Sequence, residues 1–195
     1  MRIANLSGRL IIVSGGRGID VRQASGGQFE SDPEAVYDRW AEFRSWMEQA
    51  ELPEGAEFDA ADLGSPAPAP RQLLAVGLNY RDHASESGFS VPEGLPPVFT
   101  KFATSITGPV STVALPPGGH TDWEIELVVV IGPRAWQVSE SDAWQHVAGL
   151  TGGTRPVRAG QPAGRPGPAV QPGQVAARFH PDGPTPGHAR RVRRP

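Results

Sequence analysis

Glu124 and Glu126 are the residues whose type and spacing point most directly to chemistry, because they lie two apart in the segment D-W-E-I-E-L-V-V-V-I-G. Successive side chains of a strand alternate between its two faces, so both carboxylates would share one face. Two neighbouring carboxylates repel each other unless a cation lies between them. Oxygen-rich sites of this kind suit Mg²⁺, Mn²⁺ or Ca²⁺. The pair therefore predicts either a metal site or a solvated face of a sheet.

His83 and Glu86 form a second candidate pair, three residues apart in N-Y-R-D-H-A-S-E. On one helical turn they share a face, where the carboxylate can orient the imidazole. That contact fixes one tautomer and raises the basicity of the free nitrogen, as a general base that activates water requires. A surface ion pair is the alternative interpretation. The pair directly follows residues 73–77, which are expected to form a buried strand, and this position favours a functional role because loops that follow strands often carry functional groups.

The N-terminal part of the chain predicts a small α/β unit. Apolar segments at residues 10–13 and 19–21 flank S-G-G-R-G and predict a β-hairpin. Asp32, followed by Pro33, predicts the start of a helix. The apolar stripe of that helix has helical spacing and consists of Val36, Trp40, Phe43 and Met47.

The remainder of the chain predicts a mostly β body followed by a different kind of tail. The segment G-S-P-A-P-A-P predicts a stiff linker. Strands are expected at residues 73–77, 98–102, 113–115 and 124–131, with a short helix capped by Ser139. The predicted class is α+β, mostly β. Its expected divisions are an N-terminal unit (1–64), a linker (65–70), a partial catalytic domain (71–151) and a tail (152–195).

Composition excludes several classes of protein. The chain has no cysteine, which excludes disulfides, zinc–thiolate sites and a thiol nucleophile, and is typical of a reducing cytoplasm. The apolar run at residues 10–13 is too short for the core of a signal peptide. Since no apolar run reaches the length of a membrane helix, we expect a cytoplasmic protein without a membrane partner.

Charge divides the chain at about residue 151. Residues 152–195 contain eight Arg and one Asp, a net charge of +7, together with nine Pro and eight Gly. Residues 1–151 hold ten basic and 20 acidic side chains, a net charge of −10. Such a Pro/Gly/Arg-rich segment cannot bury an ordinary core, so we expect it to be disordered.

Several motifs in order carry a family resemblance. They are G-L-N-Y-R-D-H-A-S-E, P-V-F-T-K-F, G-P, L-P-P-G, D-W-E-I-E-L-V-V-V-I-G and V-A-G-L-T. Together, over about residues 73–151, they resemble the fumarylacetoacetate hydrolase family. The resemblance implies a β-roll, of which this chain holds the first part, and a homodimer for the intact fold.

The resemblance also implies roles for individual residues. Glu124 and Glu126 match two carboxylate ligands of a divalent metal, with Mg²⁺ expected first and Mn²⁺ or Ca²⁺ as alternatives. His83 and Glu86 match the family's water-activating dyad. Lys101 matches a lysine of the active-site region. As substrate-binding residues, Tyr80 and Arg81 are expected to line the pocket beside the dyad.

The implied activity is metal-dependent cleavage of a carbon–carbon bond in a β-diketo or 2-oxo acid of the acylpyruvate type. The metal would polarise the substrate carbonyl, and the dyad would supply hydroxide from water. Isomerisation or decarboxylation of related oxo acids is an alternative outcome at the same site. A catalytically inactive fragment is a further alternative, and nucleic acid is an unexpected partner.

The chain departs from the family after V-A-G-L-T. The family continues as V-x-x-D-x-S-x-R, with the Asp as third metal ligand, whereas residues 152–159 read G-G-T-R-P-V-R-A. A one-base shift of the reading frame near Thr151 is our preferred explanation, because the shifted codons permit V-G-Q-D-L-S-E-R. A natural disordered tail or a nucleic-acid-binding tail are the alternatives, and resequencing the gene tests the shift. Without its second half, the chain should expose strand edges and apolar faces and be prone to aggregate.

Overall fold

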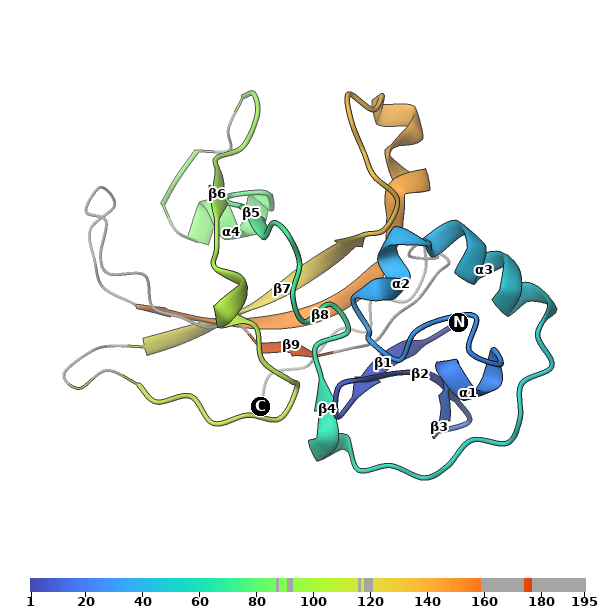
Figure 1. Ribbon diagram of the computed structural model, residues 1–195. Coiled ribbons are helices and arrows are strands. Elements are labelled where there is room, and N and C mark those ends of the chain that lie inside the picture. The colour runs from blue at the N-terminus through green and yellow to red at the C-terminus, as the bar shows by residue number, and fades with distance from the viewer. Residues whose placement is uncertain (87, 91–92, 116, 118–120, 159–173, 177–195) are drawn as a thin grey trace.

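The computed structural model describes the chain except for residues 87, 91–92, 116, 118–120, 159–173 and 177–195 (Figure 1). It is a mixed α+β structure with more strand than helix, as predicted. Most of the segment that we expected to be disordered lies outside the described residues. The described strands form three separate sheets.

The N-terminal sheet has the strand order β3-β2-β1-β4. Its strands are β1 (Ile3–Leu6), β2 (Arg9–Ser14), β3 (Arg17–Asp20) and β4 (Leu63–Gly64). The predicted hairpin is confirmed, since β2 and β3 pair antiparallel across Gly15 and Gly16. Both glycines have positive φ, a backbone conformation that costs glycine little. The short helix α1 (Val21–Ala24) follows, capped by the carboxylate of Asp20.

The single helix predicted after Asp32 is two helices, α2 (Ala35–Asp38) and α3 (Trp40–Gln49). The break lies at Arg39, which has φ −118° and ψ 28°. Asp32 accepts a hydrogen bond from Glu34 N at 2.9 Å and so turns the chain just before α2. The predicted apolar stripe is nevertheless on the core side. Three of its four residues are buried, namely Val36, Trp40 and Phe43, and Met47 packs against them.

The segment predicted as a linker packs against the N-terminal unit instead of standing free. Ser65 and Pro66 are buried. The hydroxyl of Tyr37 donates to Pro66 O at 2.9 Å, and Asn5 Nδ2 donates to Ser65 O at 2.9 Å. These bonds hold the chain close to β1 and α2, just after the 3-10 turn η1 (Ala60–Asp62) and β4.

The longest sheet is a ladder between β7 (Thr121–Ile131) and β8 (Val147–Arg158), joined by the 3-10 helix η3 (Glu140–His146). The strands are antiparallel, and Glu124 lies opposite Arg155. The short strand β9 (Gln174–Ala176) pairs with β8. Because β8 continues seven residues past Thr151, the first part of the expected tail belongs to this sheet (Figure 1).

A two-stranded sheet and one helix complete the described fold. The strands are β5 (Leu74–Val76) and β6 (Val98–Thr100), and the helix is α4 (Arg81–Glu86), followed further on by the 3-10 turn η2 (Ala103–Ser105). The expected strand at 113–115 is wrong, since these residues are in no strand. The strand predicted at 73–77 exists but is not buried. Leu74 and Val76 are exposed because the sheet has only two strands.

The N-terminal unit is anchored on the far end of the β7–β8 ladder through a shared core. Trp40 of α3 packs with Val130 of β7 and Ala148 of β8 in one buried cluster. Gly132 is the close point of this contact, because a Cβ there would lie 3.0 Å from Trp40 Cγ and 3.0 Å from the Cβ of Ala148. The backbone of Gly132 also donates to His146 O at 3.0 Å.

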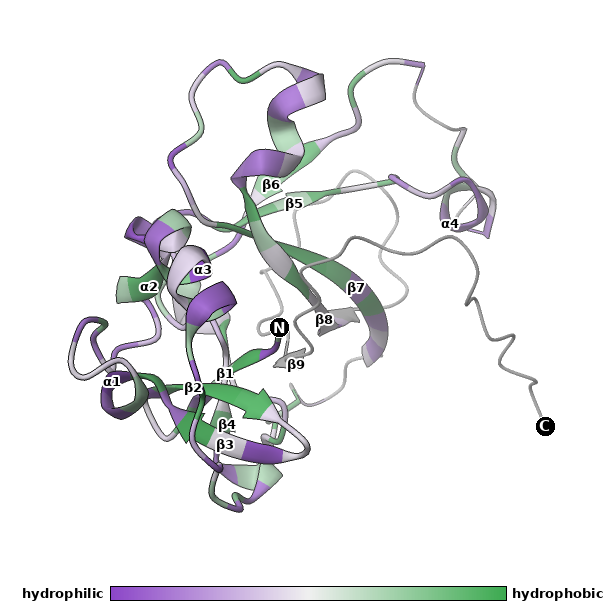
Figure 2. Ribbon diagram, turned by 90° about the vertical axis from the view of Figure 1, so that its right-hand side faces the viewer, coloured by the Kyte–Doolittle hydropathy of each residue, from purple (hydrophilic) through white to green (hydrophobic). Residues whose placement is uncertain are grey.

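One face of β7 is apolar and exposed. In Figure 2 much of β7 is coloured as hydrophobic, with hydrophilic segments toward one end. The exposed side chains of this face are Trp123, Ile125, Leu127, Val129 and Ile131. They alternate along β7 with those of the opposite face, which are Glu124, Glu126, Val128 and Val130. The expected exposure of apolar faces is therefore present on this strand. Burial of such a face normally contributes substantially to stability, so the ladder depends on its anchored end.

We predict that Gly132→Ala destabilises the chain by about 1–3 kcal/mol, because the added methyl group overpacks the contact between Trp40 and Ala148. Urea unfolding followed by tryptophan fluorescence measures the effect. Gly94→Ala is the matched control, since a Cβ at Gly94 meets no atom within 4 Å. Equal stability of the two variants would contradict the proposed anchor.

Candidate functional site

The strand β7 carries Glu124 and Glu126 on one face, as their spacing predicts. The face is the one opposite the exposed stripe of Trp123, Ile125 and Leu127. Both side chains are partly buried, with 30% and 39% of their surface exposed. Two carboxylates in such a setting need a positive partner, since water screens them incompletely.

Arg155 of β8 supplies that positive charge. Its Nε donates to Glu126 Oε1 at 2.8 Å, and its Nη2 donates to Glu124 Oε2. The guanidinium, 24% exposed, thus bridges both carboxylates with two charge-assisted hydrogen bonds. The register of the ladder causes this contact, because Arg155 stands directly opposite Glu124 and is the diagonal neighbour of Glu126, two pairs away on the same face.

Lys101 belongs to the same cluster of charges. It follows β6, and its backbone N donates to Leu73 O at 2.9 Å. Burial lowers the pKa of Lys101, and the positive charge of Arg155 lowers it further. The carboxylates of Glu126 and Glu124 act in the opposite direction but do not restore the pKa to its usual value. The structure therefore brings three of the seven predicted residues, Lys101, Glu124 and Glu126, into one electrostatic cluster.

The other four predicted residues lie on or just before α4. Tyr80 caps the helix through its carbonyl, which accepts from Ala84 N at 3.0 Å, and Arg81 begins it. His83 is partly buried and Glu86 is exposed. Within the described residues, no hydrogen bond or ion pair joins His83 to Glu86, or joins either to the β7 glutamates. The dyad shares a helix face but is not closed in this structure.

The turn that leads from β5 into α4 is strained. Leu78 has φ 52°, in the left-handed region that a branched apolar residue rarely adopts. This conformation costs about 1–2 kcal/mol. Because it occurs two residues before Tyr80, it sets the direction in which α4 leaves β5. Backbone strain of this kind is often found where a functional segment must hold one position.

Arg155 is the site residue that the sequence analysis did not single out. One signal was present. Arg155 is the fourth residue after Thr151, the place at which the motif V-x-x-D puts the third metal ligand. Taken with the strand register, this position would have placed Arg155 beside Glu124.

A divalent metal does not fit the site as its side chains stand. The two glutamates already share a guanidinium, which neutralises one of their two negative charges. Within the described ranges, no group of three or more His, Cys, Asp or Glu side chains is arranged to hold a metal ion. A dedicated Ca²⁺ or Mg²⁺ site normally uses more oxygen ligands than two. The expected ligands are thus present in part, and their partner here is Arg155.

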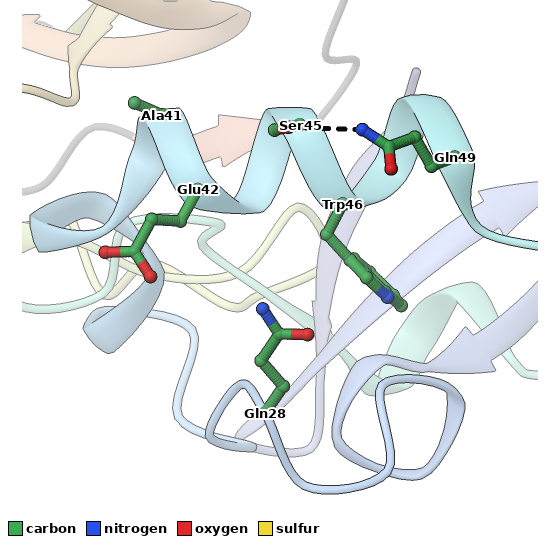
Figure 3. Close-up of a pocket in the computed structure, with 6 residues that line it drawn as sticks. All are labelled: Gln28, Ala41, Glu42, Ser45, Trp46 and Gln49. Atoms are coloured by element: carbon green, nitrogen blue, oxygen red, sulfur yellow. Dashed lines mark hydrogen bonds between the residues drawn. The ribbon is translucent and has the colours of Figure 1, made fainter.

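The rest of the described structure adds no residue to the candidate site. A hollow lined by Gln28, Ala41, Glu42, Ser45, Trp46 and Gln49 lies along α3, in the N-terminal unit and apart from the candidate residues (Figure 3). Among the described residues, no helix combines the length and apolar character that crossing a membrane requires. Neither observation adds a residue to the candidate site.

Residues 72–154 match the family described as fumarylacetoacetate (FAA) hydrolase, C-terminal. The match ends one residue before Arg155. Oxaloacetate tautomerase FAHD2A, mitochondrial, from Homo sapiens is 46% identical over 88 residues, which is 45% of this chain and 28% of the relative. The chain thus spans less than a third of the curated relatives that it matches.

Similar solved structures match a longer part of the chain. A crystal structure from Mycobacterium smegmatis with the provisional name HpcE is 48% identical with a TM-score of 0.74, and the comparison covers 84% of this chain and 59% of that one. Maleylpyruvate hydrolase from Sphingobium sp. SYK-6, solved with manganese(II) and pyruvate, is 26% identical with a TM-score of 0.63 over 83% and 60% of the two chains.

The ordered motifs, the matched family and the fold of these relatives agree. All seven predicted site residues lie inside the matched segment. Over residues 72–154 this chain is similar to the fumarylacetoacetate hydrolase family.

Proposed function

We propose that this chain binds a small oxo-acid anion and that its reaction class is hydrolysis of a carbon–carbon bond in a β-diketo or 2-oxo acid. The observation that carries the proposal is the partly buried ammonium of Lys101 beside the Glu124 and Glu126 face. A cation whose pKa is lowered by burial is destabilised by its surroundings, so an arriving anion improves its environment. A relative solved with pyruvate supports this class of ligand.

In this proposal, His83 acts as general base. Its imidazole takes a proton from water, and Glu86, one turn along α4, orients the ring and stabilises the imidazolium. Closing the dyad requires only rotation of side chains, because the two residues already share a helix face. Apo sites often hold such contacts open until substrate binds.

The bond changes follow from that proton transfer. The water oxygen adds to the substrate carbonyl carbon, and the carbonyl oxygen becomes an oxyanion that Lys101 Nζ can stabilise. The neighbouring carbon–carbon bond then breaks, and its electron pair leaves on the enolate carbon, which takes up a proton. Tyr80 and Arg81, at the start of α4, are proposed to hold the substrate carboxylate.

The family's divalent metal, Mg²⁺ by our first expectation and Mn²⁺ in one relative, would polarise a carbonyl oxygen when bound. No step is assigned to it here, because Arg155 holds the two carboxylates in this chain. Without that contribution, we expect turnover to be slow and insensitive to added metal.

Isomerisation is a second candidate reaction, because family relatives include an oxaloacetate tautomerase and a 2-hydroxyhepta-2,4-diene-1,7-dioate isomerase. A non-catalytic chain is the third, and the Arg155 bridge favours it. The homodimer expected for the intact fold stays a prediction. The cytoplasmic location also stays a prediction, since the human relative is named as mitochondrial.

We predict that the chain slowly consumes an acylpyruvate and that His83→Ala lowers the rate about 100-fold, the usual share of a general base. Loss of the enol absorbance, with and without Mg²⁺ or Mn²⁺, measures the rate, and an oxaloacetate enol tests isomerisation in parallel. Ser85→Ala is the matched control, since Ser85 lies exposed on the same helix. Rates equal to the buffer blank for every chain would establish the non-catalytic alternative.

We predict that Lys101→Met abolishes binding of pyruvate, a test oxo acid, without lowering the melting temperature. The pKa of Lys101 is lower in the folded chain than its usual value. The charged amine therefore opposes folding below its folded-state pKa, and this cost falls as pH rises above that pKa and is gone above the usual pKa of lysine. Calorimetric titration and thermal unfolding measure the two effects, with Lys101→Arg as the charge-retaining control. A lower melting temperature with unchanged binding would show a purely structural role.

A further inference from the structure

The cluster of Glu124, Glu126 and Arg155 is closed by its own side chains. Each glutamate accepts one hydrogen bond from the same guanidinium, and each of the three side chains is more than half buried. The three charges sum to −1, and the nearby ammonium of Lys101 balances the remainder. No external cation is therefore needed to keep the two carboxylates together.

The contact is fixed by the backbone as well as by charge. Arg155 faces Glu124 in a ladder that runs without interruption from Thr121 to Val130, with its bulge at the far end, between Val130 and Ile131. Cross-strand partners of opposite charge stabilise an antiparallel pair, whereas the like charges of Glu124 and Glu126 would otherwise oppose it. Arg also presents its donors in a rigid planar fork, which suits two separate carboxylates.

We propose that Arg155 takes the place of a divalent cation in this chain, so that the Glu124–Glu126 pair is an internal ion-pair cluster and does not bind metal. The proposal rests on the family assignment for the identity of the carboxylate pair, but not on any catalytic activity of the chain. A guanidinium keeps its positive charge throughout the pH range in which the two carboxylates are ionised. A metal ion would have to displace a neutralising partner that the strand register holds in place.

The direct test is Mn²⁺ binding by the full chain, followed by electron paramagnetic resonance of the free ion. We expect the unaltered chain to leave Mn²⁺ free at about 100 µM, a concentration at which built oxygen sites are filled. Arg155→Asp creates three carboxylates on one face, and we expect it to bind Mn²⁺ at least about tenfold more tightly. Tight binding by the unaltered chain that is lost in Glu124→Gln would overturn the proposal.

Two further variants separate a specific site from a change in net charge. Arg134→Asp makes the same charge change at an exposed arginine outside the cluster, and it should leave Mn²⁺ free. Adding Glu126→Gln to Arg155→Asp should abolish the new binding. Equal binding by Arg134→Asp and Arg155→Asp would show a general electrostatic effect and contradict the proposal.

The folded state of Arg155→Asp needs its own measurement, because three carboxylates without a cation repel each other. We expect a lower melting temperature in chelator and recovery on addition of Mn²⁺, which reports binding even if the metal-free variant is largely unfolded. A melting temperature that does not respond to Mn²⁺ would overturn the proposal. Failure of oxo-acid turnover would leave these metal titrations unaffected, so the two proposals fail separately.

Discussion

The register of the β7–β8 ladder is the constraint on which the site depends. It places Arg155 opposite Glu124, with Glu126 two cross-strand pairs away on the same face. Because side chains alternate along β7, the same register commits Trp123, Ile125 and Leu127 to the opposite face, where they are exposed. A shift of one residue would exchange the two faces and separate the glutamates from the guanidinium. One backbone property therefore determines both the charge cluster and the uncovered apolar stripe.

The ladder in turn is held at one end. The N-terminal unit packs its α3 against the last residues of β7 and the first of β8, through Trp40 and Ala148. The charge cluster lies toward the other end of the ladder. Among the described residues, that end is held by the backbone hydrogen bonds between β7 and β8, by the ion pairs of Arg155 and by the pairing of β8 with β9. The ladder has many backbone hydrogen bonds, but one apolar face of β7 is exposed.

The sequence predicted correctly those features that depend on residues close together in the chain. The period-two pattern around Glu124 predicted the faces of β7, and the glycine turn at residues 15–16 predicted the hairpin. The 3.6-residue pattern found the buried face of α3 but not the break at Arg39, because the apolar spacing continues across it. Exposure of β5 was missed because apolar composition does not reveal whether a covering layer exists. Arg155 was missed because its role arises from the pairing of two distant strands.

Arg155 changes the chemistry expected of the Glu124–Glu126 pair. Two carboxylates that resemble metal ligands have, in this chain, a partner supplied by the next strand. The most direct measurement of that claim is the nuclear magnetic resonance signal of the Arg155 Nε–H in the unaltered chain. The account predicts slow exchange of this proton with water and restricted rotation of the guanidinium, both lost in Glu126→Gln. A signal that exchanges as fast as that of exposed Arg134 would contradict it.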